Sequence, residues 1–272
     1  MWRYFETPSY RRLRKSQEYM ESVAVDLVSQ KLTFFKETSD GSTENPSPFS
    51  RTCLIDEYLK NPILDLSDVV GTAADFLLAG IDTTSYTTAF ALYYIARHPL
   101  IQKRMYEESL NVLQEPHLPL LAENLRTSIT YTRAVLKEVL RLNPISVGVG
   151  RILSGDLVLG GYHVPKETVV VTQNMVACRL EENFENALKF VPERWLNKNR
   201  SHINPYLVLP FGHGKRACIA RRLAEQNISV LLIRLVRSFE IIWQGTEEEM
   251  NVITLLINKP SHPIVINLKP RI

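Results

Sequence analysis

The strongest candidate for chemistry is a single cysteine in the stretch LPFGHGKRACIARRLAEQ, residues 209–226. Gly212 and Gly214 allow backbone N–H groups to turn toward the sulfur of Cys218, because glycine reaches conformations that other residues avoid. A helix is expected to follow, which places its positive N-terminal end near the sulfur, and Arg216 with the lysine before it adds positive charge. These features favour the thiolate, the form that binds metal or attacks a substrate. The alternative is a buried and unreactive cysteine.

The other two cysteines lack this setting. Cys53 lies at the edge of a polar stretch and Cys178 lies in VACRL, so an inert role fits both. Three cysteines, far apart and odd in number, argue against a disulfide framework and suit a reducing compartment. No cluster of Cys and His has the spacing of a zinc site.

A second candidate is a charged pair on one helix face. Glu138 and Arg141, in KEVLRL, lie three residues apart and can form an ion pair. A solvated pair of this kind adds little stability. Because apolar residues flank both, the pair can instead be buried, and a buried pair needs further partners to offset its desolvation. Arg194, in FVPERW, is the candidate third member.

The third candidate is LLAGIDTTSYTT, inside a long helix. Ala79 and Gly80 remove side-chain bulk at a place where glycine costs about 1 kcal/mol relative to alanine. This cost suggests that something flat or large lies against the backbone. Asp82 and Thr83 put an acid and a hydroxyl beside that gap, as a proton relay requires. The competing interpretation is a glycine that allows close helix packing, with a threonine bonded back to the preceding turn.

The elements that must position these residues are mostly helices. Helical periodicity and end signals indicate a long helix over 65–98, another over 129–142, and a third that follows the cysteine loop within 209–238. Residues 1–36 also keep a helical period, and the Pro/Gly/Ser-rich stretch 37–50 is an expected linker.

Short β-rich runs begin at Ser146, namely VGVGRIL, DLVLGGYHVP and TVVVTQN. Two or three further strands are expected near the end of the chain, in FEIIWQ, VITLLIN and PIVINL. These runs, with glycine turns between them, predict a small sheet. The expected fold class is therefore mainly α with a minor β-sheet.

Composition narrows the class of protein. A chain of 272 residues with 45% hydrophobic content can fill a core. The net charge of +3, without a long basic stripe interleaved with aromatic residues, argues against nucleic acid as a main partner. The apolar runs FLLAGI and VLLIRLV are shorter than the roughly 20 residues that cross a bilayer. Acidic residues among the first 37 argue against a targeting peptide there.

Taken together, these stretches resemble the cytochrome P450 superfamily of haem-thiolate monooxygenases. AGIDTT matches the long distal helix of that family, EVLR its Glu-x-x-Arg helix, PERW its Pro-Glu-Arg-aromatic segment and FGHGKRACIA its cysteine loop, in the family's order. The resemblance implies the cytochrome P450 fold with haem b (iron protoporphyrin IX) as cofactor. It also implies that the chain is the C-terminal portion of a single domain, because family members are much longer, with residues 1–36 in the region that roofs the pocket.

The resemblance further implies a role for each candidate residue. Cys218 matches the axial thiolate ligand of haem iron, which favours O–O cleavage. Arg216 and Arg151 match residues that pair with the haem propionates, and Asp82 with Thr83 matches an acid–alcohol pair that guides protons to dioxygen. The other positions expected beside the haem are Phe211, Gly212, Ala79 and Gly80. The structural triad that braces the proximal side, without a catalytic role, is Glu138, Arg141 and Arg194.

The sequence departs from the family's cysteine loop at two positions. Ala220 stands where glycine is usual, which adds a methyl group where the helix packs under the haem. Lys215 stands where many eukaryotic members have proline. Neither change alters the ligand, so both are expected to be tolerated.

Within the family, CIARRLAEQ resembles the mitochondrial branch, whose basic residues dock an acidic, adrenodoxin-like ferredoxin that is served by its reductase. The expected docking residues are Arg221, Arg222 and Lys137, acting by charge steering that weakens with salt. An exposed basic helix end without a partner is the alternative. The branch implies a mitochondrial protein at the matrix face of the inner membrane, associated peripherally and monomeric.

Longer strings, such as RLNPISVGVGRIL and NPYLVLPFGHG, resemble the insect mitochondrial ecdysteroid hydroxylases. The implied reaction is hydroxylation of an ecdysone precursor at the side-chain position C22, in hormone biosynthesis. Residues 145–150 and the turn at 255–257 are expected to line an apolar steroid pocket, together with Ala79 and Gly80. Two alternatives stay open: a non-catalytic fragment that cannot hold haem, and an enzyme that acts on another sterol position or on a fatty acid.

Overall fold

The structure, a computed structural model, describes residues 5–39, 53–115, 117–120, 122–196, 203–246 and 250–271. Its helices are α1 (Pro8–Ser39), α2 (Leu54–Leu59), α3 (Leu66–Arg97), α4 (Pro99–Val112), α5 (Ala122–Thr127), α6 (Thr130–Leu142), α7 (Asn174–Ala177) and α8 (Arg221–Ser238), with short 3-10 helices η2 (Pro192–Trp195) and η4 (Gly214–Arg216). Its strands are β1 (Val149–Ile152), β2 (Leu157–Leu159), β3 (Tyr162–Val164), β4 (Val169–Thr172), β5 (Phe239–Trp243), β6 (Val252–Thr254), β7 (Asn258–Pro260) and β8 (Ile266–Pro270). The fold is mainly α, as the sequence predicts. The chain divides into two compact units, residues 1–82 and 83–272.

The first unit is organised by α1 and α2. Thr7 caps α1 by accepting the N–H of Tyr10 at 3.2 Å. Lys31 and Asp56 are both 2% exposed and form an ion pair at 3.0 Å between Nζ and Oδ1. Asp56 also accepts the backbone N–H of Cys53 at 2.6 Å, which starts α2. One buried carboxylate therefore caps α2 and joins it to α1.

One boundary differs from the sequence-based expectation. The expected linker over 37–50 begins too early, because α1 continues to Ser39. The polar residues at 37–39 extend a helix that is already established, since each added residue gains a backbone hydrogen bond without a new nucleation cost. The rest of the expected linker, residues 40–50, lies outside the described residues.

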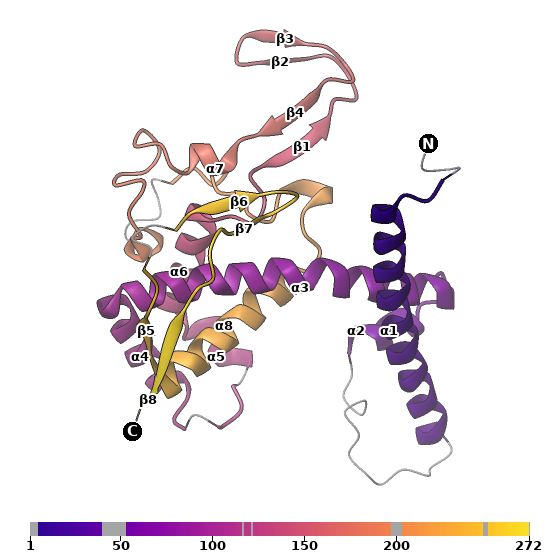
Figure 1. The fold of residues 1–272 in the computed structure, drawn as a ribbon, viewed down its shortest axis with the longest axis horizontal. Coiled ribbons are helices and arrows are strands. Elements are labelled where there is room, and N and C mark those ends of the chain that lie inside the picture. The colour runs from indigo at the N-terminus through magenta and orange to yellow at the C-terminus, as the bar shows by residue number, and fades with distance from the viewer. Residues whose placement is uncertain are drawn as a thin grey trace. The chain divides into compact units, whose positions relative to one another are not determined.

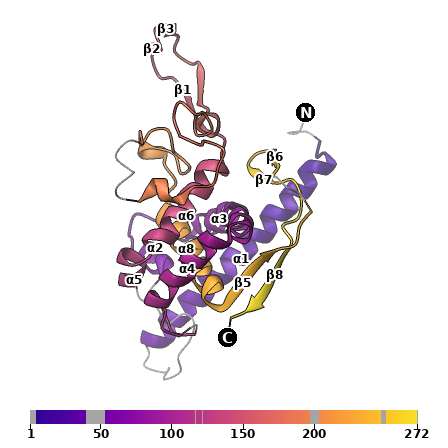
Figure 2. The same ribbon diagram turned by 90° about the vertical axis from the view of Figure 1, so that its left-hand side faces the viewer.

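The second unit has a helical core. Helices α4, α6 and α8 lie side by side in both ribbon views (Figures 1 and 2), and side chains from all three meet with the end of α3. Fully buried members of this core include Phe90, Met105, Val135, Val139 and Leu232. The long helices match the expectations from periodicity closely: α3 runs over Leu66–Arg97 and α6 over Thr130–Leu142.

The start of α6 is capped by a residue from another helix. Ile129 at the N-cap position offers no side-chain acceptor. Glu108 on α4 accepts the backbone N–H of Tyr131 at 2.6 Å, and both the N–H and the hydroxyl of Thr132, at 2.9 and 2.6 Å. Helix N-termini leave N–H groups without intrahelical partners and favour a negative charge. Packing of α4 against α6 therefore supplies a cap that the α6 sequence lacks.

The strands form four separate antiparallel pairs in the described residues, β1–β4, β2–β3, β5–β8 and β6–β7, where the sequence predicted one small sheet. The expected strand VITLLIN is instead a hairpin, with Val252 of β6 opposite Pro260 of β7. Figures 1 and 2 both show the β2–β3 hairpin extending away from the helices of the second unit. None of the described helices combines the length and apolarity that a membrane span requires.

Glycine is required at the entry to β1. A Cβ atom at Gly148 would overlap the backbone carbonyl of Thr172, the last residue of β4. The Thr172 hydroxyl also accepts the N–H of Val149 at 3.0 Å. Gly148 therefore lets the segment after α6 approach β4 at a distance that no other residue permits.

Candidate haem site and proximal groove

The cysteine loop presents its sulfur at the start of α8. Gly212 and Gly214 have φ values of +74° and +72°, a region that only glycine reaches without strain. The backbone N–H of Cys218 donates to the carbonyl oxygen of Phe211 at 2.8 Å, which closes the loop. Cys218 is exposed, and α8 begins three residues later at Arg221. The alternative of a buried cysteine is therefore wrong for this position in the described structure, and the reactivity of Cys218 stays a prediction.

The structure brings β1 to the same loop. The Arg151 guanidinium donates to the backbone carbonyl of His213 at 3.4 Å. A Cβ atom at Gly212 would lie 3.9 Å from the Val149 side chain, so β1 and the loop are in near contact. Arg216 ends the 3-10 turn beside Gly214, and its side chain is exposed, as is that of Arg151.

This arrangement fits a haem group. An exposed cysteine sulfur is a soft donor of the kind that binds iron. Two arginines on the adjoining loop and strand offer donors with the planar geometry that suits carboxylates. The described residues contain no group of three or more His, Cys, Asp or Glu side chains able to hold a metal ion by themselves.

The Glu138–Arg141 pair is fully buried, at 0% exposure for both side chains. Arg141 uses all five of its N–H groups: two contact Glu138, at 2.8 and 2.9 Å, and three contact backbone carbonyls. Those carbonyls belong to Cys178, Ala187 and Lys189. Because every donor is satisfied, the cost of burying the guanidinium is offset. The solvated alternative for this pair is therefore wrong.

Arg194 joins the pair, as the sequence suggested, by donating to Glu138 at 3.0 Å. The backbone N–H of Val191 donates to the same oxygen at 3.0 Å. The Trp195 indole N–H donates to the other carboxylate oxygen at 2.8 Å, a contact that sequence reasoning missed. The aromatic residue of PERW is Trp195 itself, and its indole N–H is a donor that could have been expected to pair with Glu138. Glu138 thus accepts five hydrogen bonds and joins α6 to η2.

The α3 candidates lie in the middle of that helix. Gly80 has open space beside it, since a Cβ atom there would meet no described atom within 4 Å. In the part of the chain that the structure describes, no neighbouring helix lies within 4 Å of that position. Ala79 and Asp82 are exposed and Thr83 is half-buried. The Thr83 carbonyl accepts the hydroxyl of Thr87 at 2.8 Å, so a back-bonded threonine occurs in this stretch one turn after Thr83.

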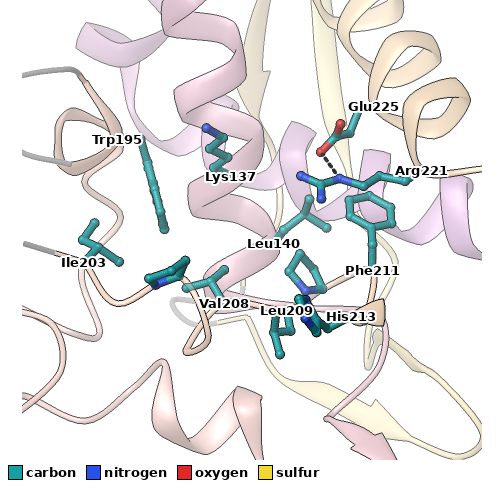
Figure 3. Close-up of a pocket in the computed structure, with 13 residues that line it drawn as sticks. Lys137, Leu140, Trp195, Ile203, Val208, Leu209, Phe211, His213, Arg221 and Glu225 are labelled. Atoms are coloured by element: carbon teal, nitrogen blue, oxygen red, sulfur yellow. Dashed lines mark hydrogen bonds and ion pairs between the residues drawn. The ribbon is translucent and has the colours of Figure 1, made fainter. Parts of the chain in front are cut away.

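A groove of about 350 Å³ lies on the side of the cysteine loop that faces α6 (Figure 3). Its lining includes Lys137 and Leu140 from α6, Phe211 from the loop, and Arg221 from α8. Arg221 pairs with Glu225 at 3.2 Å, and its guanidinium lies 5.5 Å from the Phe211 ring centroid. Trp195 stands on the opposite wall in Figure 3.

A second groove, of about 740 Å³, adjoins the first along α5, α6 and α8. Lys137, Arg221 and Arg222 all line it, so the structure brings together the three expected docking residues. Arg126 and Arg133 line it as well. Sequence reasoning missed these two, although both lie within one helix turn of the start or end of α5 and α6.

The two remaining cysteines have different surroundings, since Cys178 is buried and Cys53 is exposed. Cys178 is buried, its sulfur donates to the Leu207 carbonyl at 3.3 Å, and burial raises its pKa to about 11. A neutral thiol of this kind is unreactive at ordinary pH. Cys53 is exposed at the N-cap of α2, where its backbone N–H donates to the Asp56 carboxylate.

Residues 1–268 match the cytochrome P450 family, and the chain belongs to that family. It is 59% identical over 271 residues to cytochrome P450 302a1, mitochondrial, of Drosophila melanogaster, covering 100% of this chain and 53% of that protein. It is 29% identical to the ecdysone 20-monooxygenase of the same species over 283 residues, covering 100% of this chain and 50% of that protein. The chain spans about half the length of these curated relatives.

Two further comparisons agree with this assignment. The chain is 37% identical over 208 residues to the mitochondrial 1,25-dihydroxyvitamin D(3) 24-hydroxylase of Rattus norvegicus, covering 76% of this chain and 40% of that protein. The crystal structure of a cytochrome P450 (CYP102L1) superposes with a TM-score of 0.80 at 26% identity, covering 96% of this chain and 57% of that one. The fold expected from the sequence motifs is therefore confirmed.

Proposed function

We propose that the whole protein is a haem-thiolate monooxygenase that hydroxylates an ecdysone precursor at C22, with dioxygen and electrons from a ferredoxin. The observation that carries this proposal is the cysteine loop, in which two left-handed glycines and the bond from Cys218 to Phe211 present an exposed sulfur at the start of α8. Family membership supports the reaction class. The identity to a mitochondrial insect relative supports the substrate class and the mitochondrial location.

Each part of the site has a proposed role. Bound haem supplies the oxidising chemistry that inserts one oxygen atom into a C–H bond, and Cys218 is its ligand. Arg216 and Arg151 hold its carboxylates, while Phe211 and Gly212 lie beside it. Asp82 and Thr83 deliver protons to dioxygen. The Glu138, Arg141 and Arg194 triad holds η2 against α6 and has no part in the chemistry.

The substrate pocket is proposed to be apolar, with one wall from residues 145–150 and another from the β6–β7 turn. Leu255 and Leu256 in that turn are 74% and 95% exposed. Exposed leucines in adjacent positions indicate a surface that another apolar group covers. A sterol side chain suits that requirement, and hydroxylation at C22 follows from the resemblance to insect ecdysteroid hydroxylases.

Cys218→Ala tests the ligand assignment. Because the sulfur anion produces the characteristic carbon monoxide difference spectrum of this family, the variant of the whole protein should lose that spectrum completely. Cys178→Ala is the matched control and should keep it, since the Cys178 thiol is buried and neutral. A Cys218→Ala protein with an unchanged spectrum would exclude the assignment. Products formed from ecdysone precursors that lack a C22 hydroxyl then identify the position of hydroxylation.

The alternative, that the 272-residue chain is a remnant unable to hold haem, has its own test. The chain is expressed alone with haem supplied, and its absorption spectrum is recorded. A stable complex that a ferredoxin reduces would contradict the remnant interpretation. Apoprotein that precipitates would support it, because the chain spans about half the length of its relatives.

The basic groove is the proposed docking site for an acidic, adrenodoxin-like ferredoxin. Lys137, Arg221 and Arg222 gather there with two further arginines, and Glu225 neutralises part of that charge. Arg222→Glu should slow reduction by ferredoxin about tenfold at low salt and less at high salt, because steering by exposed charges is screened. Lys166→Glu makes the same charge change between β3 and β4 and should leave the rate unchanged. Equal effects of the two variants would contradict docking at the groove.

A further inference from the structure

Asn258, the first residue of β7, is a polar side chain with 0% exposure. Its amide nitrogen lies 2.7 Å from the Pro144 carbonyl oxygen and 3.3 Å from the Met175 sulfur. Its amide oxygen accepts the hydroxyl of Thr254 at 2.6 Å. Its backbone N–H donates to the Ile145 carbonyl at 2.8 Å. One residue therefore joins the β6–β7 hairpin to the end of α6 and to α7.

The hydrogen bond between Thr254 and Asn258 lies at the base of the β6–β7 turn. Thr254 ends β6 and Asn258 begins β7, so the bond between their side chains closes the turn from within. The residues between them include Leu255 and Leu256, whose side chains are almost entirely exposed. Two side chains next to these leucines therefore anchor the turn, namely Asn258 through its hydrogen bonds and Ile257, which packs against the core.

The other partners lie where the chain leaves α6. Pro144 and Ile145 lead directly into the segment 145–150, and the Val147 carbonyl of that segment accepts the N–H of Met175 at 3.0 Å. Asn258 contacts the start of this segment through two bonds and the side chain of Met175 through a third. The turn and the segment are thus joined at Asn258, through its buried side-chain amide and its backbone N–H.

From these contacts we propose that Asn258 is a positioning residue that determines which carbon of the substrate is hydroxylated. It sets the separation between the Leu255–Leu256 turn and the segment 145–150. This inference rests on the proposed function, in which both line the sterol pocket. Asn258 touches neither the haem nor the reacting carbon in this account, and it carries no charge. Its effect is geometric, because buried amides keep their hydrogen-bond partners in specific directions.

Asn258→Leu keeps the side-chain size and removes the amide. The Pro144 carbonyl and the Thr254 hydroxyl then lack partners inside the protein, so the turn is expected to move away from the segment. Thr254→Val removes one of these bonds and preserves the others, and it should give a smaller shift in the same direction. Asn267→Leu, on the exposed face of β8, makes the same substitution outside this junction and is the control.

The test uses the whole protein with haem bound and four measurements. The carbon monoxide difference spectrum reports the haem ligand and should be unchanged in Asn258→Leu. Affinity for imidazole, which is too small to reach the turn, should also be unchanged. Affinity for ketoconazole, a much larger azole that is expected to extend to the turn, should fall about fivefold or more, as expected for the loss of one buried hydrogen bond. The products from an ecdysone precursor should include a second hydroxylated position.

The outcomes separate this inference from the proposed function. Unchanged ketoconazole affinity and an unchanged product ratio in Asn258→Leu would overturn the positioning role while leaving the monooxygenase intact. A wild-type protein that binds haem but hydroxylates no sterol would overturn the proposed substrate, and the ketoconazole comparison would still decide the role of Asn258. Absence of the carbon monoxide spectrum in the wild type would overturn both. If Asn258→Leu fails to fold, Thr254→Val decides by the same measurements.

Discussion

Glu138 shows how hydrogen bonds offset the free-energy cost of burying a charged side chain. Glu138 is fully buried and accepts two N–H groups from Arg141, one from Arg194, one from Trp195 and one from the backbone of Val191. A carboxylate offers about four lone-pair sites, so its acceptor capacity is fully used. Such a group stabilises the fold only while every partner is present, because an unpaired buried charge costs several kcal/mol.

Trp195→Phe tests this dependence at the residue scale. The substitution keeps an aromatic ring but removes the indole N–H, so the free energy of unfolding should fall by about 1 kcal/mol or more from the lost bond to a charged acceptor. Trp243→Phe is the control, because that indole packs edge-on against Tyr93 at 5.1 Å between ring centroids. Chemical denaturation of the haem-bound whole protein measures both. A loss no larger than in the control would contradict the role assigned to the Trp195 N–H.

Elements are placed by contacts that lie outside them. The cap of α6 comes from Glu108 on α4, and the segment between α6 and β1 is placed by its approach to β4. The helix that carries Lys137, Glu138 and Arg141 is therefore fixed at its start by one neighbour and at its end by another. The position of α6 within the second unit depends on both contacts.

Gly148→Ala tests the close approach at the element scale. A Cβ atom there overlaps the Thr172 carbonyl, which is backbone and cannot rotate away, so β1 must separate from β4. The expected cost is about 1–3 kcal/mol, typical of forced overpacking, with weaker binding of any ligand that contacts residues 145–150. Gly150→Ala is the control, since its added Cβ would lie 3.9 Å from Val171 in ordinary contact. Thermal unfolding and ketoconazole affinity measure both variants, and equal behaviour would contradict the prediction.

At the scale of the whole molecule, the two units are stabilised differently. The second unit has a large apolar core around α4, α6 and α8. In the first unit, the join between α1 and α2 depends on the buried Lys31–Asp56 pair. Burial acts to raise the pKa of Asp56, but the Cys53 N–H and the Lys31 ammonium outweigh it, and the pKa is lowered below its usual 3.8.

Because the pKa of Asp56 is lowered in the folded protein, its contribution to stability decreases as the pH falls. The stabilisation from Asp56 is fully present above the pKa of the unfolded chain, at pH about 4, and is lost as pH falls through the lower pKa of the folded state. Hydrogen exchange in α1 and α2 should therefore accelerate as the pH falls below about 4, after correction for intrinsic exchange rates. Asp56→Asn should remove this dependence and cost about 3–5 kcal/mol, because the buried Lys31 ammonium loses its ion pair with the Asp56 carboxylate.

The control for this prediction is Glu57→Gln, which alters an exposed pair with Lys60 at 3.4 Å. Surface pairs contribute about 0–1 kcal/mol, so this variant should retain the acid-induced acceleration. A wild-type protein with no acceleration in α1 and α2 would show that the buried pair does not control the stability of the first unit.

The sequence by itself determined the features that depend on near neighbours. The two glycines and the helix start that present Cys218 lie within nine residues of one another, and Glu138 with Arg141 lies on one helix face, so local pattern was sufficient for both. The same holds for α3 and α6, whose periodicity predicted their bounds within a residue. The four motifs and their order resembled those of the family that the comparisons show.

Only the tertiary structure decided contacts between residues far apart in the chain. Trp195 reaches Glu138 across 57 positions and Asn258 reaches Pro144 across 114, and neither spacing follows from any helical or strand period. The basic groove likewise gathers arginines from three helices. The physical reason is that hydrogen-bond partners and surface charges are chosen by how packed elements meet. A sequence pattern records only which face of one element is apolar.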